Sequence, residues 1–243
     1  MLKIVDNVPS SSEAQLRERL EHIGESPDFS AFFERFVKRA PNTIKKGTLI
    51  FNEGDPLGRL YYIKEGFVKL YRLTSEGRDG TTYLLGPGNL LGLRALLSDD
   101  ESAKHHAEAI TDAKILTVSR KEYLDAIMHD PRLLVDLMHA YIERLNYTEQ
   151  KLVGYMFTDA TARVAYFLQM TAKRFGKKEN NMVALPVPLT HQLIADFVGS
   201  FRETVSVALK KLEKEGAIKT AKGIITIQHI ENLEKYASGE VEV

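Results

Sequence analysis

Apolar residues in the stretch Leu189–Glu215 recur every three or four positions, in two runs separated by a glycine. This period is typical of amphipathic α-helices with one buried face. Thr190 stands where an N-cap would begin the first helix, and Gly199 supplies the positive φ that a sharp turn requires. The stretch predicts a helix-turn-helix whose buried faces are Leu193, Ile194 and Phe197 and then Val205, Ala208, Leu209 and Leu212.

The second of these helices carries a polar face that suits contact with DNA. Ser200 and Glu203 have the spacing of a capping box, which predicts that the helix begins at about Phe201. An arginine can donate two hydrogen bonds to guanine and a glutamate can accept one from cytosine, so Arg202 and Glu203 suit a G·C pair. The whole face comprises Arg202, Glu203, Ser206, Lys210 and Lys214. The alternative interpretation is a helical hairpin with ordinary surface charges.

Two short strand-like segments, Ala217–Thr220 and Ile224–Ile227, follow the helix-ending Gly216. They predict a β-hairpin, which is the wing of a winged helix-turn-helix. Lys222, at the tip of this wing, is placed to contact a DNA phosphate, and such a contact positions a protein without specifying sequence. The C-terminal part is therefore predicted to bind double-stranded DNA.

Residues 43–118 show a different pattern, in which short apolar runs alternate with glycine-containing turns. Many short strands at close spacing predict a compact antiparallel roll, and such a roll can enclose a ligand cavity. Leu90–Leu97 is predicted to be a short helical segment that covers the ligand. A roll with a filled core and no ligand is the alternative. The candidate strands are Thr48–Asn52, Arg59–Lys64, Gly66–Leu73, Thr81–Leu85, Ala107–Ile110 and Lys114–Ser119.

The longest periodic segment runs from Leu133 to about Phe157 and predicts one long helix. Its apolar residues occupy positions a and d of one heptad frame, which favours a homodimer over the alternative of packing on the roll. Two recognition helices would then meet the two half-sites of a palindromic DNA site. Glu149 interrupts the seam, where a charge is costly unless it is paired, and so marks a candidate ligand-sensitive point. The seam is Val135, Met138, Ile142, Leu145, Leu152 and Met156.

The predicted fold class is α+β. The chain divides into an N-terminal arm of unclear role (1–28), a β-roll sensor domain (29–126), a dimerisation helix (127–157), a winged helix-turn-helix domain (158–236) and a tail (237–243). Further predicted elements are helices at Ser12–Ile23, Phe29–Arg39 and Thr161–Phe175 and a loop at Gly176–Asn181.

Composition narrows the class of protein. The chain of 243 residues contains no cysteine, which excludes disulfides and thiolate-bound iron–sulfur clusters. Its net charge is zero, yet residues 160–227 hold eleven Lys and Arg against five Asp and Glu, a net charge of +6. A basic module on an acidic body is expected of a DNA-binding protein. No apolar run approaches the ~20 residues of a transmembrane helix, and no signal peptide is recognisable, so we expect a cytoplasmic protein without membrane contact.

These segments, in this order, resemble the cyclic-AMP receptor protein/FNR family of bacterial transcription regulators. The resemblance covers nearly all of residues 30–230 and is carried by KKGTLIFNEGD, YYIKEGFVKLY, LLGPGNLLG, FTDATARVAYFL and VGSFRETVSVALKKLEKEG. It implies a cyclic-nucleotide-binding-like β-roll, a dimerisation helix and a DNA-binding winged helix-turn-helix. RNA polymerase is a further candidate partner.

The resemblance also indicates where an effector would bind, and it argues against cyclic AMP. In the family, a glycine–glutamate pair holds the ribose of a cyclic nucleotide and an arginine–serine pair holds its phosphate. Here Gly92 matches, but Leu93 replaces the glutamate, and Ala103 and Lys104 replace the arginine and the serine. A leucine cannot accept the ribose hydrogen bond and an alanine cannot neutralise the phosphate, so we expect a different effector.

Several residues near this loop are candidate contacts for such an effector. Arg94, Lys104 and His105 would suit an anionic ligand, and a solvated basic rim is the alternative. The family positions on the long helix that touch ligand fall on Thr148 and Glu149, and Thr148 keeps the family's hydroxyl.

The cofactor is unknown. Haem is a candidate, because two adjacent histidines lie in this region and a third lies in the N-terminal arm. Adjacent residues on a strand point to opposite faces, so at most one of the adjacent pair faces a pocket. The three are His105, His106 and His22.

For DNA recognition, the family's leading arginine and glutamate match Arg202 and Glu203. Val207 replaces a second arginine and is expected to meet a thymine methyl instead of a guanine, beside Ser206, which matches the serine of the FNR-like branch. The positions that match phosphate contacts are Thr190 and Gln192.

The predicted function is a homodimeric, sequence-specific transcription regulator controlled by a small effector in the roll. One alternative is a ligand-independent regulator with an empty roll. Another is a haem or small-molecule sensor whose C-terminal module contacts protein. An enzyme is not expected, because no nucleophile elbow, phosphate-binding glycine loop or metal-spaced histidine motif is present.

Overall fold

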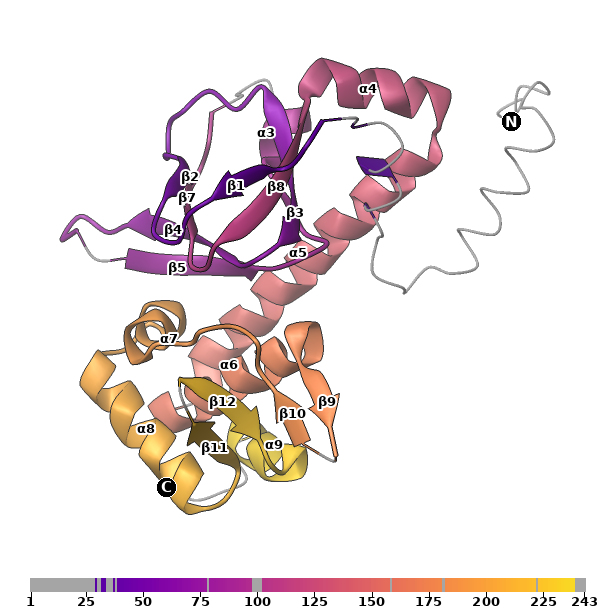
Figure 1. Ribbon diagram of the computed structural model, residues 1–243. Helices are drawn as coiled ribbons and strands as arrows, with labels where there is room; N and C mark the ends of the chain where they lie inside the picture. Colours follow the sequence, from indigo (N-terminus) through magenta and orange to yellow (C-terminus); the bar gives the residue numbers. More distant parts are fainter. Residues whose placement is uncertain are drawn as a thin grey trace, which may run out of the picture.

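The computed structural model describes residues 29, 32–33, 37, 39–77, 79–97, 102–157, 159–180, 182–221 and 223–238. These residues form two domains connected by one long helix (Figure 1). The N-terminal arm 1–28 with its predicted helix Ser12–Ile23, most of Phe29–Arg39, residues 239–243 and Lys222 lie outside the described residues.

The first domain is a β-roll of two antiparallel four-stranded sheets, as the pattern of short strands predicted. One sheet has the order β1 (Asn42–Ile44), β8 (Ala113–Ser119), β3 (Arg59–Glu65), β6 (Leu90–Leu91). The other has the order β2 (Leu49–Phe51), β7 (His106–Ala109), β4 (Val68–Leu73), β5 (Asp79–Leu85). Their shared core includes Ile63, Val68, Leu91, Ala107 and Ile115.

The predicted helical segment Leu90–Leu97 is correct only for its last five residues. Its first two residues are strand β6, and the helix α3 (Leu93–Leu97) begins only after Gly92, whose φ of +81° turns the chain. The strand residues pair with Tyr61 and Tyr62 of β3, so the apolar run serves the sheet first.

Two helices lead out of the roll. Helix α4 (Arg120–His129) starts at Ser119, which forms a capping box with Glu122. Helix α5 (Arg132–Phe157) follows as the predicted long helix. The predicted dimerisation segment 127–157 begins before α5 does, because residues 127–129 belong to α4 and Asp130 ends that helix.

The second domain begins with α6 (Ala160–Phe175), whose N-cap Asp159 accepts a 2.7 Å hydrogen bond from the Ala162 amide. It continues with β9 (Lys177–Glu179), β10 (Met182–Ala184), α7 (His191–Val198), α8 (Arg202–Lys214), β11 (Ile218–Ala221), β12 (Ile224–Ile227) and α9 (Ile230–Ser238). The β11–β12 hairpin confirms the predicted wing, in a sheet of order β11-β12-β10-β9.

The predicted loop Gly176–Asn181 is wrong for three of its residues. Lys177–Glu179 form the edge strand β9, which pairs antiparallel with β10. All three side chains are exposed. An edge strand that buries no side chain has no apolar alternation, so the period that identifies strands is missing.

The two domains touch along more than the long helix. Helix α7 packs against β5 of the roll, as Figure 1 shows. The buried core of the C-terminal domain includes Phe67 and Leu84 from the roll and Tyr147 from α5. The position of the helix-turn-helix therefore depends on contacts with the roll.

Replacing Gly66 with alanine is expected to destabilise the roll. Gly66 has φ +87°, and an added Cβ would meet the carbonyl oxygen of Asp112 and lie 2.7 Å from the Ala113 Cα. Gly77→Ala is the matched control, because Gly77 has φ +75° with nothing within 4 Å of the added atom. Urea unfolding should show that Gly66→Ala lowers the free energy of unfolding by about 1–3 kcal/mol more than Gly77→Ala. Equal losses would contradict the role of this close approach.

Candidate DNA-binding surface and effector region

The helix-turn-helix forms as its sequence predicted. The Thr190 hydroxyl accepts a 3.1 Å hydrogen bond from the Leu193 amide and so caps α7. Gly199 ends that helix in the left-handed conformation, with φ +63°. The buried Ala195 lies in the last turn of α7, and its carbonyl accepts hydrogen bonds from the amides of Gly199 and Ser200.

The predicted capping box at the start of α8 is wrong. The N-cap is Phe201, which makes no side-chain cap hydrogen bond, and α8 begins at Arg202. The Ser200 amide donates to the Ala195 carbonyl at 3.0 Å, so Ser200 completes the end of α7 instead of beginning α8. Glu203 is therefore not used as a cap, and its exposed carboxylate is available to a base edge.

Helix α8 divides into a buried and an exposed face. Val205, Ala208, Leu209 and Leu212 are buried, as predicted. Helix α8 lies at the outer edge of the domain (Figure 1). Its exposed face carries Arg202, Glu203, Val207 and Lys210. Val207 is 68% exposed and lies on this face between the charged side chains.

Ser206 is held by a neighbour that sequence reasoning missed. Its hydroxyl donates to the Arg202 carbonyl at 2.8 Å and contacts the His191 Nδ1 at 2.7 Å. His191 lies at the start of α7, so the contact ties the two helices of the motif together. The sequence could have indicated this contact, because His191 and Ser206 are fifteen residues apart in a motif whose two helices cross near these positions.

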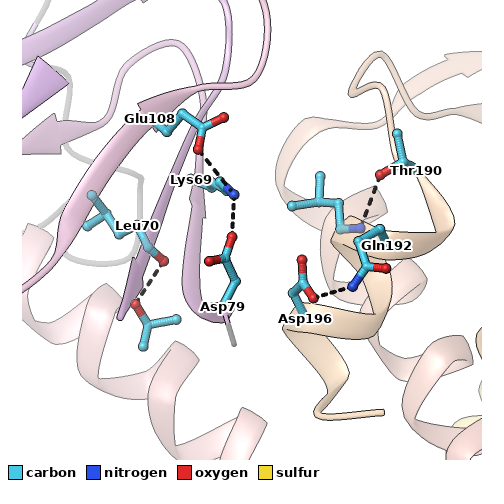
Figure 2. Close-up of polar contacts among 9 residues, drawn as sticks. Lys69, Leu70, Asp79, Glu108, Thr190, Gln192 and Asp196 are labelled. Atoms are coloured by element: carbon cyan, nitrogen blue, oxygen red, sulfur yellow. Dashed lines mark hydrogen bonds and ion pairs between the residues drawn. The ribbon is translucent and has the colours of Figure 1, made fainter. Parts of the chain in front are cut away.

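The predicted phosphate contacts of α7 lie near the roll. Figure 2 shows Gln192 and Asp196 of α7 opposite Asp79 and Lys69 of the roll. The Gln192 amide donates to Asp196 at 2.7 Å, and the Lys69 ammonium lies 2.8 Å from Asp79 and 3.2 Å from Glu108. Burial, followed by the charge of Asp79, raises the pKa of Asp196. This bond uses one of the two N–H donors of the Gln192 amide, so the other can contact a phosphate.

The wing is anchored to the recognition helix. The Thr220 amide of β11 donates to the Glu213 carboxylate of α8 at 2.8 Å. The hairpin turns at Gly223, whose φ is +77°. The predicted contact of Lys222 lies outside the described residues, so it stays a prediction.

The predicted dimer seam on α5 is largely uncovered. Val135 is half-buried. The other predicted seam residues are 50–65% exposed, namely Met138, Ile142, Leu145, Leu152 and Met156. Glu149 is also exposed, so in one copy of the chain its carboxylate is solvated and carries no cost of burial. A row of large exposed apolar side chains along one helix marks an interaction surface.

The predicted effector residues of the roll differ in burial. Leu93 is 2% exposed and packs in a core with Leu60 and Leu133. Arg94 is exposed, and Lys104 is half-buried with its ammonium 2.9 Å from the Ser102 hydroxyl. These side chains therefore lie in different surroundings.

Tyr83 occupies the space between the roll and Thr148, and sequence reasoning missed it. The Thr148 hydroxyl donates to the Arg144 carbonyl at 2.9 Å, so the Tyr83 hydroxyl, 2.8 Å away, donates to Thr148. The Tyr83 ring lies 6.0 Å from that of His105 and 5.0 Å from the Arg144 guanidinium carbon. Tyr83 of β5 thus connects the roll to α5 through this hydrogen bond.

The adjacent histidines face different surroundings, as predicted. Burial first, and then the charges of Arg144 and Arg72, lower the pKa of His105 to about 4. His105 is therefore neutral at pH 7 and supplies no positive charge to an anionic ligand. His106 stacks on Tyr71 at 5.0 Å, and its Nδ1 accepts from the Glu53 amide at 3.3 Å.

Lys151 of α5 joins the roll to the helix-turn-helix. Its ammonium donates to the Thr81 carbonyl of β5 at 2.7 Å and lies 3.9 Å from the Phe197 ring centroid on α7. Tyr155, one turn later, donates its hydroxyl to the Phe197 carbonyl. Burial lowers the pKa of Lys151 to about 8. One face of α5 thus holds both domains at this point.

Among the described residues, no helix combines the length and the apolar character needed to cross a lipid bilayer. In the same part of the chain, no group of three or more His, Asp or Glu side chains is arranged to hold a metal ion.

Comparison with known proteins agrees with this architecture. Residues 41–130 match the cyclic nucleotide-binding domain, and residues 162–236 match the Crp-like helix-turn-helix domain. The chain is 31% identical over 197 residues to a CRP-like cAMP-activated global transcriptional regulator of Mycobacterium tuberculosis, covering 81% of this chain and 88% of that protein. It is 29% identical over 186 residues to a global nitrogen regulator of a Nostoc species, covering 76% and 83%.

A solved structure shows the same arrangement of domains. FixK2 from Bradyrhizobium japonicum superposes with a TM-score of 0.71 at 27% identity, over 82% of this chain and 97% of that one. The fold and the two matched domains define a class of DNA-binding transcription regulators that carry an effector-binding domain. The chain belongs to the CRP/FNR family, whose members of known function here are regulators and not enzymes.

Lys151 is expected to make stability depend on pH. In the unfolded chain it keeps its proton up to about pH 10.5, whereas in the folded chain it loses the proton above about pH 8. The unfolded state therefore binds more protons between these values, and stability rises with pH, by at most about 1.4 kcal/mol per pH unit. Urea unfolding at pH 8–9.5 should show this rise in the wild type relative to Lys151→Met. Lys178→Met, at an exposed site on β9, is the control, and a pH-independent difference for Lys151→Met would refute the assignment.

Proposed function

We propose that this chain is a homodimeric, sequence-specific DNA-binding regulator that acts in the bacterial cytoplasm and responds to a small effector other than cyclic AMP. The observation that carries the proposal is the exposed face of α8, where Arg202, Glu203 and Val207 are all exposed to solvent. The preceding helix of the motif, α7, is capped by Thr190. The wing beside it is fixed to α8 through Glu213.

The dimer is inferred from α5. The exposed seam residues repeat at heptad spacing along a helix that connects sensor and DNA-binding domain. Pairing two such helices would remove the apolar row from water and place two copies of α8 against successive half-sites of a palindrome.

Cyclic AMP is a poor candidate effector. The Mycobacterium tuberculosis relative is described as cAMP-activated, and the Nostoc relative as a nitrogen regulator, so relatives of this chain differ in what controls them. In this chain Leu93 and Ala103 are buried apolar side chains at the positions where the family holds ribose and phosphate. Neither can form the required polar contacts, which supports a different effector.

One observation favours a second candidate function, a regulator that needs no ligand. Tyr83 already bonds to Thr148 and thereby links roll and α5, a link that a ligand would otherwise provide. An absorption spectrum and a denaturing mass spectrum of freshly purified protein separate the candidates. A co-purified small molecule supports the effector, and a Soret band identifies it as haem. A colourless, empty protein that binds its operator tightly supports the ligand-independent regulator.

Glu203→Ala is expected to relax base discrimination at one pair in each half-site. The glutamate is proposed to accept from a cytosine N4, a contact worth about 1–3 kcal/mol of discrimination. Operators selected from random duplexes would be varied one base pair at a time and their affinities measured at fixed salt. Lys210→Ala is the control, because losing a cation should weaken all sequences about equally and reduce the salt dependence. Intact discrimination at every operator base in Glu203→Ala would show that this residue does not recognise bases.

A further inference from the structure

A cleft of about 610 Å³ lies where the roll, α5 and α6 meet. Its walls are the turn between β5 and β6, the middle of α5 and the C-terminal half of α6. We call it the junction cleft. Its volume falls in the range of small-molecule sites in proteins. Of the roll residues expected to bind effector, Leu93 borders the cleft, whereas Arg94, Lys104 and His105 are not among its lining residues.

A dimer partner on the α5 seam would leave this cleft open. The lining residues Glu143, Tyr147 and Gln150 follow one another at spacings of four and three on α5. In the heptad frame of the seam they occupy positions b and f, on the side of the helix away from positions a and d. The cleft is therefore a feature of one copy of the chain.

Two guanidinium groups border the cleft without a carboxylate partner among the described residues. Arg144 donates to the Leu90 carbonyl at 2.9 Å. Arg174 donates to the Leu84 carbonyl at 3.1 Å and to the Asn89 side-chain oxygen at 3.4 Å. All three acceptors are uncharged, and each guanidinium has five N–H donors, so both keep unused donors.

The charges around the cleft favour an anion. Its lining contains the cations Arg144, Lys173 and Arg174 against the single carboxylate of Glu143. Burial first, together with the charge of Arg174, lowers the pKa of Arg144 to about 10. A partly buried cation next to another cation is unfavourable unless an opposite charge joins them.

A stack of aromatic rings holds the two guanidiniums in place. The Arg144 guanidinium carbon lies 5.0 Å from the Tyr83 ring centroid, and that of Arg174 lies 4.8 Å from the Tyr147 centroid. The two tyrosine rings stack on each other at 5.6 Å. A guanidinium that stacks on a ring keeps its N–H donors in its own plane, so its edges can still bind a carboxylate or phosphate.

We propose that the junction cleft is a binding site for a small organic anion, whose carboxylate or phosphate lies between Arg144 and Arg174 and whose flat body lies against the aromatic wall that includes Tyr166. The occupant would contact the roll, α5 and α6 at once. It would therefore bind the sensor domain and the DNA-binding domain together. The proposal concerns binding alone and does not depend on the proposed DNA recognition.

The test uses the full chain and two probes of nearly equal shape, 2-naphthoate and the neutral 2-naphthamide, in isothermal titration calorimetry. We expect one 2-naphthoate per chain and binding of 2-naphthamide weaker by about tenfold or more, because charge-assisted hydrogen bonds are lost. Arg144→Gln and Arg174→Gln should each weaken 2-naphthoate by about tenfold or more. Arg174 is exposed, so its variant should retain the wild-type melting temperature.

Arg94→Gln is the matched control, since it removes an exposed arginine near the expected effector region of the roll and should change affinity less than twofold. The proposal is overturned if 2-naphthoate does not bind at millimolar concentration, or if 2-naphthamide binds equally well. It is also overturned if both cleft variants bind 2-naphthoate as the wild type does, or if Arg94→Gln alone abolishes binding.

Discussion

Helix α5 has two apolar faces, and the arrangement of the molecule depends on how each of them is covered. One face is covered within the chain, by the roll near Leu133 and Leu137 and by the C-terminal core near Tyr147. The opposite face carries the apolar seam, which nothing in a single described chain covers. An uncovered apolar row of this length is unfavourable in water, so α5 requires a second surface.

The covered face of α5 also sets the position of the recognition helix. Lys151 bonds to β5 and lies on the Phe197 ring of α7, and Tyr155 bonds to the Phe197 carbonyl. Because α7 packs on β5, the roll and the helix-turn-helix are joined by a direct contact as well as by α5. The junction cleft adjoins the same part of α5, so an occupant there would act on the same contacts. We propose that an effector would shift the chain between two packings of α5 against its neighbours.

Local signals in the sequence predicted the elements well, and non-local chemistry escaped prediction. Thr190 and Gly199 identified the helix-turn-helix because a cap and a positive-φ turn act within a few residues. Ser200 led to a wrong prediction of a capping box, because a serine between two helices can either end the first or begin the second. Here its amide bonds to the Ala195 carbonyl and so ends α7. The link from Tyr83 to Thr148 joins positions 65 residues apart, and no periodicity encodes such a pair. The heptad pattern likewise predicted which face of α5 is apolar but not what covers the other face.

Cysteine cross-linking tests the pairing of α5 most directly, because the natural chain contains no cysteine and a single introduced one has no competitor. Leu152→Cys places the thiol at a d position of the seam, and Gln150→Cys places it at a b position on the far side. If two copies pair along the seam, mild oxidation converts Leu152→Cys to a disulfide-linked dimer on a non-reducing gel while Gln150→Cys stays monomeric. Rapid cross-linking of Gln150→Cys with none for Leu152→Cys would contradict the seam as the dimer interface.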